Sequence, residues 1–328
     1  MASVLLPTRE WTDACDELAA QLRADDELLV ICDAPDDPVT DHPAAGGSAT
    51  TDPAAGDPAT TDPAADCDPS SNVRVVVAGE PTGCSGKANA LAVGLEAAAR
   101  DRIVCTDGDF VHGPEWLRTV SSLLDRHAAV STVPVFESDV PPWPLIEPVM
   151  AIGSLALLQR DGVWGGLMAF DRRDVDLDRL RADLRRTVSD DGLLWERLDD
   201  VTTVRSLRRR VPVDGRLRPA LDRWARFVRT FYFFAPRGLG ALLGVWAACA
   251  ALSVASLPVA ALGTAAAAAG VYRAVGTDRW TWLLAYPAVV LLPLLLAVGL
   301  ARREFEWTGR RYRWAAKFDV RVVSERSE

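Results

Sequence analysis

Two carboxylates one residue apart are the strongest candidates for chemistry in this sequence. Asp107 and Asp109 follow the apolar run 102–106 (RIVCT), with Gly108 between them. At the carboxyl end of a strand in an α/β sheet, such side chains face the crevice where ligands bind. Mg²⁺ prefers a few protein oxygens completed by substrate phosphates. The pair therefore predicts a site for a hard divalent cation and the ribose of a nucleotide.

A lysine at a predicted helix start is the second candidate. Lys87 lies in the segment 85–91 (SGKANAL), and the chain has only one other lysine, because its remaining basic residues are arginines. The P-loop pattern fails, since Pro81 replaces its first glycine and Ala88 replaces its Ser or Thr. We predict that Lys87 steadies a phosphate or a nucleotide edge, the alternative being a solvated surface lysine.

Two further segments combine small residues with carboxylates. Gly165 and Gly166 allow the backbone to approach a ligand closely, although a glycine kink in a core strand is the alternative. Later, Asp190 and Asp191 follow Ser189 before a predicted helix. Helix capping would account for one carboxylate, which leaves the other for acid–base chemistry.

Alternating elements must position these residues. Apolar runs predict strands at 3–6, 28–32, 73–78 and 102–106, and helical spacing predicts helices at 11–23 and 87–99. This order favours an α/β domain with a mainly parallel sheet covered on both faces. Residues 36–71, rich in Asp, Pro, Ala and Thr, are predicted to be a disordered insertion because they offer little apolar surface to bury.

Composition excludes several classes of protein. The net charge of -9, with arginine in place of lysine, is typical of a halophilic proteome, so the charge itself indicates no partner. We expect no nucleic-acid partner. The six cysteines form no CxxC pair, which argues against zinc and redox sites. The opening MASVLLPTRE lacks the features of a signal peptide, so we expect the first part of the chain in the cytoplasm.

The last third of the chain is predicted to be membrane-embedded. Residues 239–274 are almost continuously apolar around Pro258, and 280–300 form a second run of bilayer-spanning length. A buried hairpin of a soluble protein is the alternative. Arginines flank both ends of this region, so both flanks are expected to be cytoplasmic and the number of crossings even. Splitting the first apolar run at Pro258 gives three spans in total, which conflicts with an even number of crossings. We favour two full crossings plus a re-entrant or interfacial piece.

The segment before the first span combines arginines with aromatic residues. Residues 218–229 (RPALDRWARFVR) predict an amphipathic helix on the bilayer surface, and this helix could present Arg223 to a diphosphate. The predicted organisation is an α/β domain over 1–217, an interfacial helix over 218–237, two to three transmembrane helices over 238–301 and a cytoplasmic tail over 302–328.

Taken in order, these motifs resemble the membrane-bound branch of glycosyltransferase family 2, particularly relatives of ceramide glucosyltransferase. The resemblance covers most of the chain outside the insertion. The matching segments are PTRE (7–10), Asp33, SGKANAL (85–91), TDGD (106–109), WGGLMAF (164–170), SDDGLL (189–194), Arg223-Trp224 and EWTGRRY (306–312).

This resemblance implies a GT-A fold and an inverting, metal-dependent transfer of a hexose from a UDP- or GDP-linked sugar to a membrane lipid. It implies that Asp191 is the catalytic base and that Asp109, together with Asp107, holds Mg²⁺ or Mn²⁺. The donor would contact Asp33 at its base and Asp107 at its ribose or sugar. The remaining donor-binding candidates are Lys87, Gly165, Gly166, Arg223 and Trp224.

The chain departs from the family pattern at two positions. Ala220 stands at the first position of the Gln/Arg-x-x-Arg-Trp motif, and Asp190 replaces the usual glutamate before Asp191. Two alternatives therefore stay open: a polyprenyl-phosphate sugar transferase, and a catalytically inactive member serving as a membrane interaction subunit. The sequence leaves the sugar, the acceptor and the oligomeric state undetermined.

Overall fold

The computed structural model describes residues 1–43, 49–50, 72–109 and 111–325. The chain forms two compact units. Unit 1 comprises Met1–Ser131 and Gly165–Thr202, and unit 2 comprises Thr132–Trp164 and Thr203–Glu328. Most of the predicted insertion at 36–71 lies outside the described residues. The domain boundaries given above stay a prediction.

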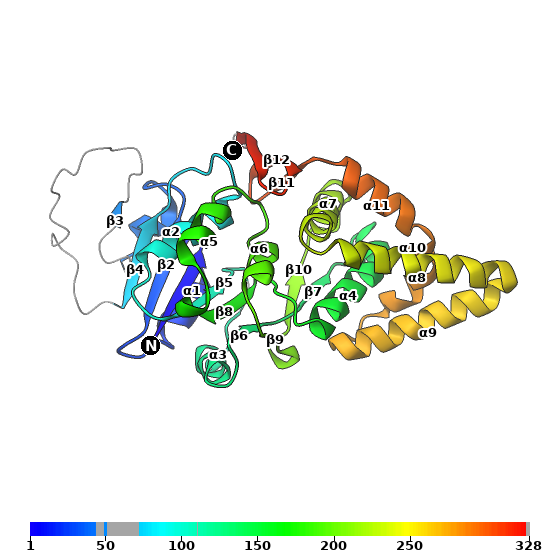
Figure 1. The fold of residues 1–328 in the computed structure, drawn as a ribbon, viewed down its shortest axis with the longest axis horizontal. Helices are drawn as coiled ribbons and strands as arrows, with labels where there is room; N and C mark the ends of the chain where they lie inside the picture. Colours follow the sequence, from blue (N-terminus) through cyan, green and yellow to red (C-terminus); the bar gives the residue numbers. More distant parts are fainter. Residues whose placement is uncertain (44–48, 51–71, 110, 326–328) are drawn as a thin grey trace. The chain divides into compact units, whose positions relative to one another are not determined.

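Unit 1 is built on an eight-stranded sheet in the order β3-β4-β2-β1-β5-β8-β6-β9 (Figure 1). The pairs from β3 to β5 are parallel, whereas β8 runs antiparallel to both β5 and β6. The predicted α/β class with a mainly parallel sheet is therefore confirmed. The strands are β1 (Ala2–Pro7), β2 (Glu27–Cys32), β3 (Ala49–Thr50), β4 (Val73–Val77), β5 (Arg102–Thr106), β6 (Ala129–Ser131), β8 (Leu167–Asp171) and β9 (Val201–Thr203).

Helices of unit 1 pack closely on this sheet. All of β2 is buried, as expected of a parallel strand covered on both faces. A Cβ atom at Gly94 of α2 would collide with the Ile31 side chain, so glycine allows this helix to approach the sheet. The helices are α1 (Asp13–Ala19), η1 (Pro38–Asp41), α2 (Gly86–Ala97), α3 (Trp116–Leu124), η2 (Arg172–Asp174), α5 (Leu177–Leu184) and α6 (Asp190–Arg197).

The strand order reverses next to β1. From β1 the chain proceeds outward to β2 and β4, and it then returns to β5 on the opposite side of β1. In sheets of this kind, ligands bind outside the carboxyl ends of the strands at the point of reversal. The topology therefore marks the ends of β1 and β5 as the place for a site.

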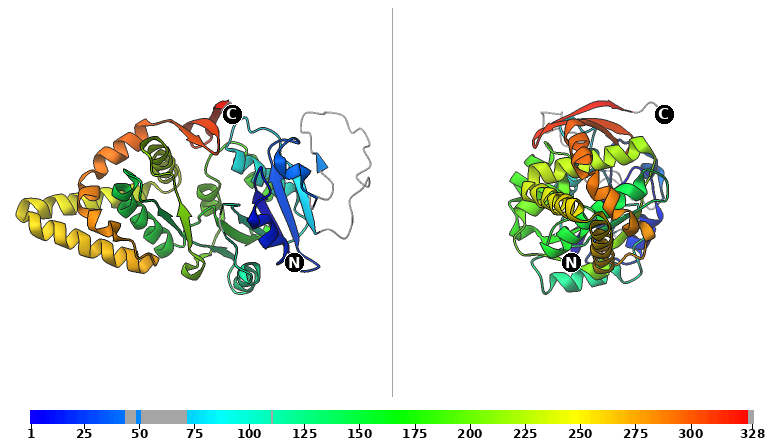
Figure 2. Two further views of the ribbon diagram at one scale, coloured as in Figure 1. Left: turned by 180° about the vertical axis from the view of Figure 1, so that it is seen from behind. Right: turned by 90° about the vertical axis from the view of Figure 1, so that its right-hand side faces the viewer.

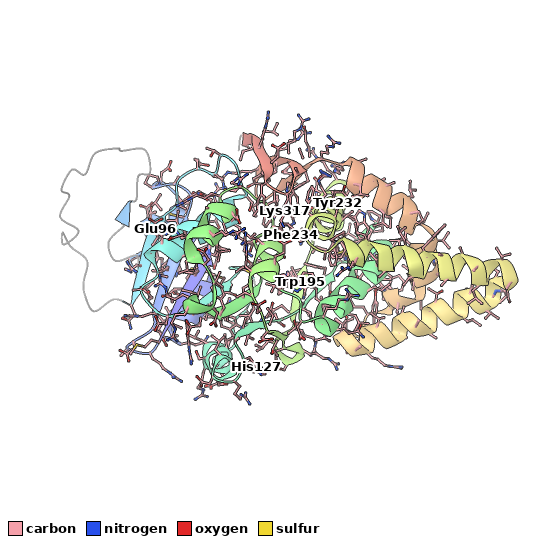
Figure 3. The ribbon with its side chains drawn as sticks, in the orientation of Figure 1. Glu96, His127, Trp195, Tyr232, Phe234 and Lys317 are labelled. Carbon is pink, nitrogen blue, oxygen red and sulfur yellow. The ribbon has the colours of Figure 1, made fainter. Side chains whose placement is uncertain are left out.

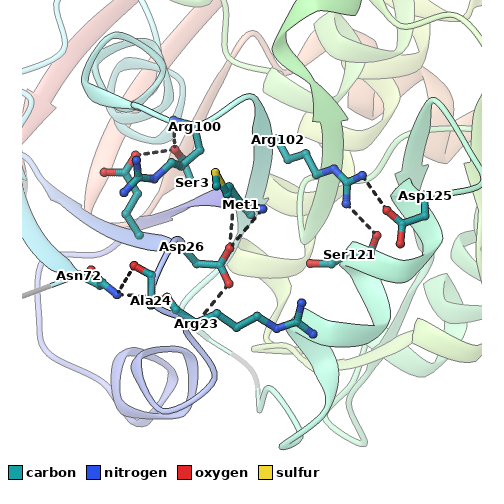
Figure 4. Close-up of polar contacts among 12 residues, drawn as sticks. Met1, Ser3, Arg23, Ala24, Asp26, Asn72, Arg100, Arg102, Ser121 and Asp125 are labelled. Atoms are coloured by element: carbon teal, nitrogen blue, oxygen red, sulfur yellow. Dashed lines mark hydrogen bonds and ion pairs between the residues drawn. The ribbon is translucent and has the colours of Figure 1, made fainter.

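Polar contacts fix the opposite edge of the sheet, where β1 and β5 begin (Figure 4). The Asp26 carboxylate accepts hydrogen bonds from the backbone N–H groups of Ala2 at 2.8 Å and Arg23 at 3.2 Å. Arg102, the first residue of β5, contacts Asp125 at 2.7 Å. These hydrogen bonds and the contact between Arg102 and Asp125 hold the starts of β1 and β5 in place, so this edge of the sheet has a structural role.

Unit 2 contains a long amphipathic helix, α7, as predicted before the apolar region. Its buried face includes Ala220, Trp224, Val228 and Phe231 at helical spacing. At its end, Lys317 Nζ lies 4.6 Å from the centroid of the Phe234 ring (Figure 3), so the second lysine of the chain makes a cation–π contact. The elements of unit 2 are β7 (Pro134–Glu137), α4 (Trp143–Gln159), η3 (Arg205–Leu207), β10 (Arg209–Pro212), α7 (Leu217–Phe234), α8 (Pro236–Ala255), α9 (Leu257–Val275), η4 (Trp280–Leu284), α10 (Ala285–Val290), α11 (Leu292–Ala301), β11 (Glu304–Trp307), β12 (Arg310–Ala316) and β13 (Asp319–Glu325).

Two helices of unit 2 are long and apolar enough to cross a membrane. They are α8 and α9, with mean hydropathies of 1.9 and 1.2, and they lie side by side (Figure 2). Ser256 ends α8 and begins α9. Pro258 therefore falls in the first turn of α9, where a missing N–H costs little. Large apolar side chains face outward, including Val254, which is 92% exposed, and Leu262, which is 73% exposed. Such a surface suits lipid better than water.

The second apolar run forms a bent pair of helices. Trp280–Val290 and Leu292–Ala301 meet at 75°, which makes them a broken span or a re-entrant loop. The described residues thus contain two candidate spans, or three if the bent pair is counted. The prediction of two to three apolar C-terminal helices is confirmed by length and composition.

A buried carboxylate ties α4 to the loop after α9. Glu147 Oε1 accepts hydrogen bonds from Arg279 Nε at 2.7 Å and Thr281 Oγ1 at 2.5 Å, and the residue is only 3% exposed. Arg279 also contacts Asp139 at 2.8 Å. Burial raises the pKa of Glu147, although the bonds from Thr281 and Arg279 oppose this shift. The arginine is therefore needed to compensate a carboxylate that water does not reach.

Replacing Glu147 with Ala is expected to destabilise unit 2. The substitution leaves Arg279 with only the exposed Asp139 as an ionic partner. Breaking a buried ion pair costs about 3 kcal/mol, which corresponds to a fall of roughly 6–12 °C in the thermal unfolding midpoint. The matched control is Asp139→Asn, which removes the exposed partner of the same arginine and should change the midpoint little. Equal shifts for the two variants would contradict the importance of the buried pair.

Candidate active site

The loop after β5 carries both carboxylates of the predicted cation site. Thr12 Oγ1, from the connection after β1, donates to the Gly108 carbonyl at 3.4 Å. A Cβ atom at Gly108 would lie 3.6 Å from the Thr8 Cβ. The loops after β1 and β5 therefore meet where the strand order reverses. Asp109 is exposed there, and the Asp107 side chain is 26% exposed.

Lys87 lies at the centre of the site. Its Nζ contacts Asp107 Oδ1 at 2.5 Å, the Gly165 carbonyl at 2.9 Å and Asp190 Oδ2 at 3.2 Å. An ammonium has three N–H donors, so three acceptors can satisfy it fully. The side chain is only 13% exposed, which differs from a solvated surface lysine. Lys87 thus joins three segments that are far apart in the sequence.

The start of α2 holds this lysine in place. Ser85 caps the helix, its Oγ accepting from the Ala88 N–H at 3.1 Å and donating to the Val188 carbonyl at 3.0 Å. The Ser85 N–H donates to the Thr187 carbonyl at 3.1 Å. One serine therefore both begins the lysine-bearing helix and fixes it to the segment that leads into Asp190.

The two carboxylates at the start of α6 have different surroundings. Asp190 is 3% exposed and contacts Lys87, whereas Asp191 is partly exposed. Ser189 caps the helix and donates to Asp191 Oδ1 at 2.5 Å, and the Gly192 N–H donates to the same oxygen at 2.8 Å. Within the described residues, both of these hydrogen bonds to Asp191 use Oδ1. Its Oδ2 is thus the oxygen suited to accept a proton.

Burial and mutual repulsion set the charges of this cluster. Removal from water raises the pKa of Asp107 to about 6; Lys87 opposes the shift and Asp109 adds to it. Burial likewise raises the pKa of Asp190 against the effect of Lys87. Burial lowers the pKa of Lys87, but the carboxylates of Asp107 and Asp190 outweigh it and the net pKa is raised. One ammonium therefore lies among the three carboxylates of Asp107, Asp190 and Asp191, and the site retains an excess of negative charge.

This excess fits a divalent cation held partly by a substrate. The described residues contain no group of three or more His, Cys, Asp or Glu side chains arranged to hold a metal. Asp109 is exposed, and Lys87 engages only one oxygen of Asp107. Mg²⁺ and Mn²⁺ sites that use one or two carboxylates plus substrate phosphates need no more than this.

The glycine pair lies beneath the lysine. The Gly165 carbonyl accepts from Lys87 Nζ, and the Gly166 carbonyl accepts from Thr106 Oγ1 at 3.0 Å. A Cβ atom at Gly165 would lie 2.6 Å from Lys87 Nζ and 3.2 Å from Asp190 Oδ2. The close approach expected of these glycines is thus made to Lys87, and their contact with a donor stays a prediction.

Gly165→Ala is expected to displace Lys87 and weaken the cluster. Overpacking of this kind costs about 1–3 kcal/mol, so the thermal unfolding midpoint should fall by a few degrees. Gly113→Ala is the matched control in unit 1, because a Cβ atom there meets nothing within 4 Å. If Gly165→Ala and the control unfold at the same temperature, the lysine does not need the space that this glycine provides.

The remaining predicted donor contacts are spread over both units. Asp33 follows β2 at the same sheet edge as Asp107, with β1 between the two strands, and its N–H donates to Asp37 at 2.8 Å. In unit 2, Trp224 is fully buried and its Nε1 donates to the Leu295 carbonyl at 2.7 Å. Arg223 lies 5.1 Å from the centroid of the Phe136 ring. The roles of Asp33, Arg223 and Trp224 towards a donor stay predictions.

Sequence reasoning missed the contribution of Asp190. It treated this residue only as the neighbour of Asp191, whereas the structure places its carboxylate on Lys87. The expectation that one of the two carboxylates caps α6 was wrong, because Ser189 is the cap and both carboxylates lie in the first turn. Ser85, which caps α2, was given no role in the sequence analysis. The available signal was a serine directly before each predicted helix, a position where a hydroxyl satisfies an otherwise unpaired backbone N–H.

The sequence matches no family model and no curated protein. Among solved structures, the chain is similar to glucosyl-3-phosphoglycerate synthase from Mycobacterium tuberculosis, with 18% identity, coverage of 69% of this chain and 75% of that chain, and a TM-score of 0.36. It is also similar to residues 1–349 of TarS from S. aureus, with 12% identity, coverage of 70% and 64%, and a TM-score of 0.39. Similarity at this level supports no inference about activity.

Proposed function

We propose that this protein is an inverting, metal-dependent glycosyltransferase with a GT-A fold. It moves a hexose from a nucleotide-sugar to a membrane lipid at the cytoplasmic face. One arrangement supports the proposal above all: Lys87 joins Asp107, after β5, to Asp190, next to Asp191. The same chain carries two helices long and apolar enough to span a membrane.

In this proposal, Asp191 removes the proton from the acceptor hydroxyl. The oxygen attacks the anomeric carbon from the face opposite the leaving diphosphate, and a single displacement inverts the configuration. The hydrogen bonds from Ser189 and the Gly192 N–H orient the carboxylate at the start of α6. Asp191 is therefore oriented before an acceptor arrives.

Asp109 and Asp107 would hold Mg²⁺ or Mn²⁺ together with the donor diphosphate. When bound, the cation neutralises charge on the departing diphosphate. Lys87 contacts Asp107 on one side and Asp190 on the other, so it fixes the position of the cation-binding loop relative to the helix that carries the base. The UDP- or GDP-linked donor would also contact Asp33, Gly165 and Gly166.

The membrane helices favour a lipid acceptor and a single transfer. Two or three apolar helices bring an acceptor headgroup to the enzyme, but they offer too little protein for a channel that passes a polymer. The acceptor carries either a hydroxyl or, in the polyprenyl-phosphate alternative, a phosphate.

Turnover of nucleotide-sugars tests the proposal. The purified full chain in detergent, given common UDP- and GDP-sugars, should release nucleoside diphosphate in Mn²⁺ but not in a chelator. The variant Asp109→Asn should lose most of this release while keeping the thermal unfolding midpoint, because Asp109 is exposed. Absence of metal-dependent turnover with every donor would favour an inactive interaction subunit instead.

A further inference from the structure

The bent pair of helices in unit 2 presents an apolar outer face. Trp280, Leu283 and Leu294 are each more than half exposed. The inner face packs within the protein, since Ala288 and Leu292 belong to the hydrophobic core that α4 and α7 share. α10 also packs on α8 and α9, so the outer face continues their exposed apolar surface. A partner of this face must therefore be apolar, and the acyl chains of a lipid leaflet are.

The helices α4 and α7, against which the bent pair packs, begin side by side. Strands β7 and β10 lead into these two helices and pair with each other in parallel. In the loops that follow them, a Cβ atom at Gly215 would lie 2.4 Å from the Val140 carbonyl oxygen and 3.0 Å from the Trp143 Cβ. The start of α4 is therefore next to the start of α7.

Both ends of the bent pair are tied to this common start. Before the pair, Arg279 donates to the Ser138 carbonyl at 3.0 Å and to Asp139 at 2.8 Å, just ahead of α4. After the pair, Arg302 donates to Asp222, in the second turn of α7, at 2.7 Å. The chain thus leaves this part of unit 2 at Arg279 and comes back to it at Arg302.

The bent pair is also shorter than the apolar core of a bilayer. Its two arms are about 19 Å and about 15 Å long, since a residue rises about 2.0 Å in the 3₁₀ turns of η4 and about 1.5 Å in an α-helix. With a bend of 75°, the outer ends lie roughly 27 Å apart, whereas the hydrocarbon core is about 30 Å thick. Figures 1 and 2 both show the α8–α9 hairpin reaching further from α7 than the bend between α10 and α11.

We infer that the bent pair is an anchor in a single lipid leaflet. It enters the lipid from the side of α4 and α7, places Trp280, Leu283 and Leu294 among the acyl chains and returns without crossing. Trp280 directly follows Arg279, a combination suited to the boundary between headgroups and acyl chains. Within the described part of the chain, α8 and α9 are then the two crossings, and both arginine-rich flanks lie on one side. The inference does not depend on the transfer reaction.

Labelling of single cysteines tests the return of the chain. The full chain, with its native cysteines replaced, carries one new cysteine at a time in sealed vesicles that are treated with a membrane-impermeant maleimide. Ser206→Cys, before α7, and Arg313→Cys, in β12, both replace exposed residues and should label from the same side. Ser256→Cys, between α8 and α9, should label from the other side. If Arg313→Cys labels from the side opposite to Ser206→Cys, the bent pair crosses and the inference is wrong.

Spin labels on the outer face test its contact with lipid. Labels attached at Leu283→Cys and Leu294→Cys are read by their collisions with oxygen, which concentrates in hydrocarbon, and with a water-soluble nickel chelate. Both labels should favour oxygen, at a depth within one leaflet, whereas the control label at Arg313→Cys should favour nickel. Labels that favour nickel would show that the face lies in water. Labels that neither reagent reaches would show that protein covers it, and either result overturns the inference.

Discussion

Replacing Asp191 with Asn is expected to lower sugar transfer to a hydroxyl acceptor by about 10²- to 10⁴-fold, the usual contribution of a general base. The amide oxygen of Asn can still accept hydrogen bonds from the Ser189 hydroxyl and the Gly192 N–H, so the first turn of α6 should be preserved. The loss should therefore appear in the catalytic rate, with little change in the thermal unfolding midpoint. Initial rates at saturating donor and lipid measure it directly.

The same substitution distinguishes the two kinds of acceptor. A phosphate acceptor is already ionised and needs no base, so Asp191→Asn would spare most of its transfer. Asp190→Asn is the matched control on the neighbouring carboxylate, which is buried against Lys87 and not proposed to meet the acceptor. Its main effect should be on stability. A variant Asp191→Asn with full activity towards every acceptor would exclude Asp191 as the base.

Replacing Lys87 with Met should have the largest effect on the structure of the site. The substitution leaves Asp107 and the buried Asp190 without their shared cation. Breaking a buried ion pair costs about 3 kcal/mol, which lowers the thermal unfolding midpoint by roughly 6–12 °C. Transfer should fall with it, because both the cation-binding loop and the start of α6 lose their common contact.

A double substitution separates the charge of Lys87 from its packing. In Lys87→Met with Asp190→Asn, the buried carboxylate that lost its partner is itself removed, so part of the stability should return. Lys87→Arg keeps the charge but places a larger group against Gly165. There is little room there, because a Cβ atom added to Gly165 would lie only 2.6 Å from the Lys87 ammonium. The thermal unfolding midpoint of this variant should lie between those of Lys87→Met and the unchanged protein. A single variant Lys87→Met as stable as the unchanged protein would contradict the structural role of this ion cluster.

Much of unit 1 was predictable from local patterns. The apolar runs ending at Cys32 and Thr106 became β2 and β5, and the run SGKANAL became the start of α2. These elements were accessible because strand and helix periodicities are properties of neighbouring residues. The membrane helices were predictable for the same reason, since length and apolar composition alone identify them.

The contacts that assemble the site were not predictable in this way. Lys87 and Asp190 lie about a hundred residues apart, and only the fold brings them together. The antiparallel placement of β8 beside β5, which puts the Gly165 carbonyl under the lysine, likewise depends on pairing between distant strands. The burial of Trp224 was not predicted either, because the sequence pointed to a donor contact, whereas the structure packs this side chain on the buried face of α7.

The most direct test of the account measures the product. Membranes that contain the full chain are incubated with Mn²⁺ and isotope-labelled nucleotide-sugars, and the extracted lipids are analysed by mass spectrometry. The account predicts one lipid class that gains a single labelled hexose, and loss of that product in membranes carrying Asp109→Asn. Labelled lipid that forms equally with Asp109→Asn, or no labelled lipid with any donor, would contradict it.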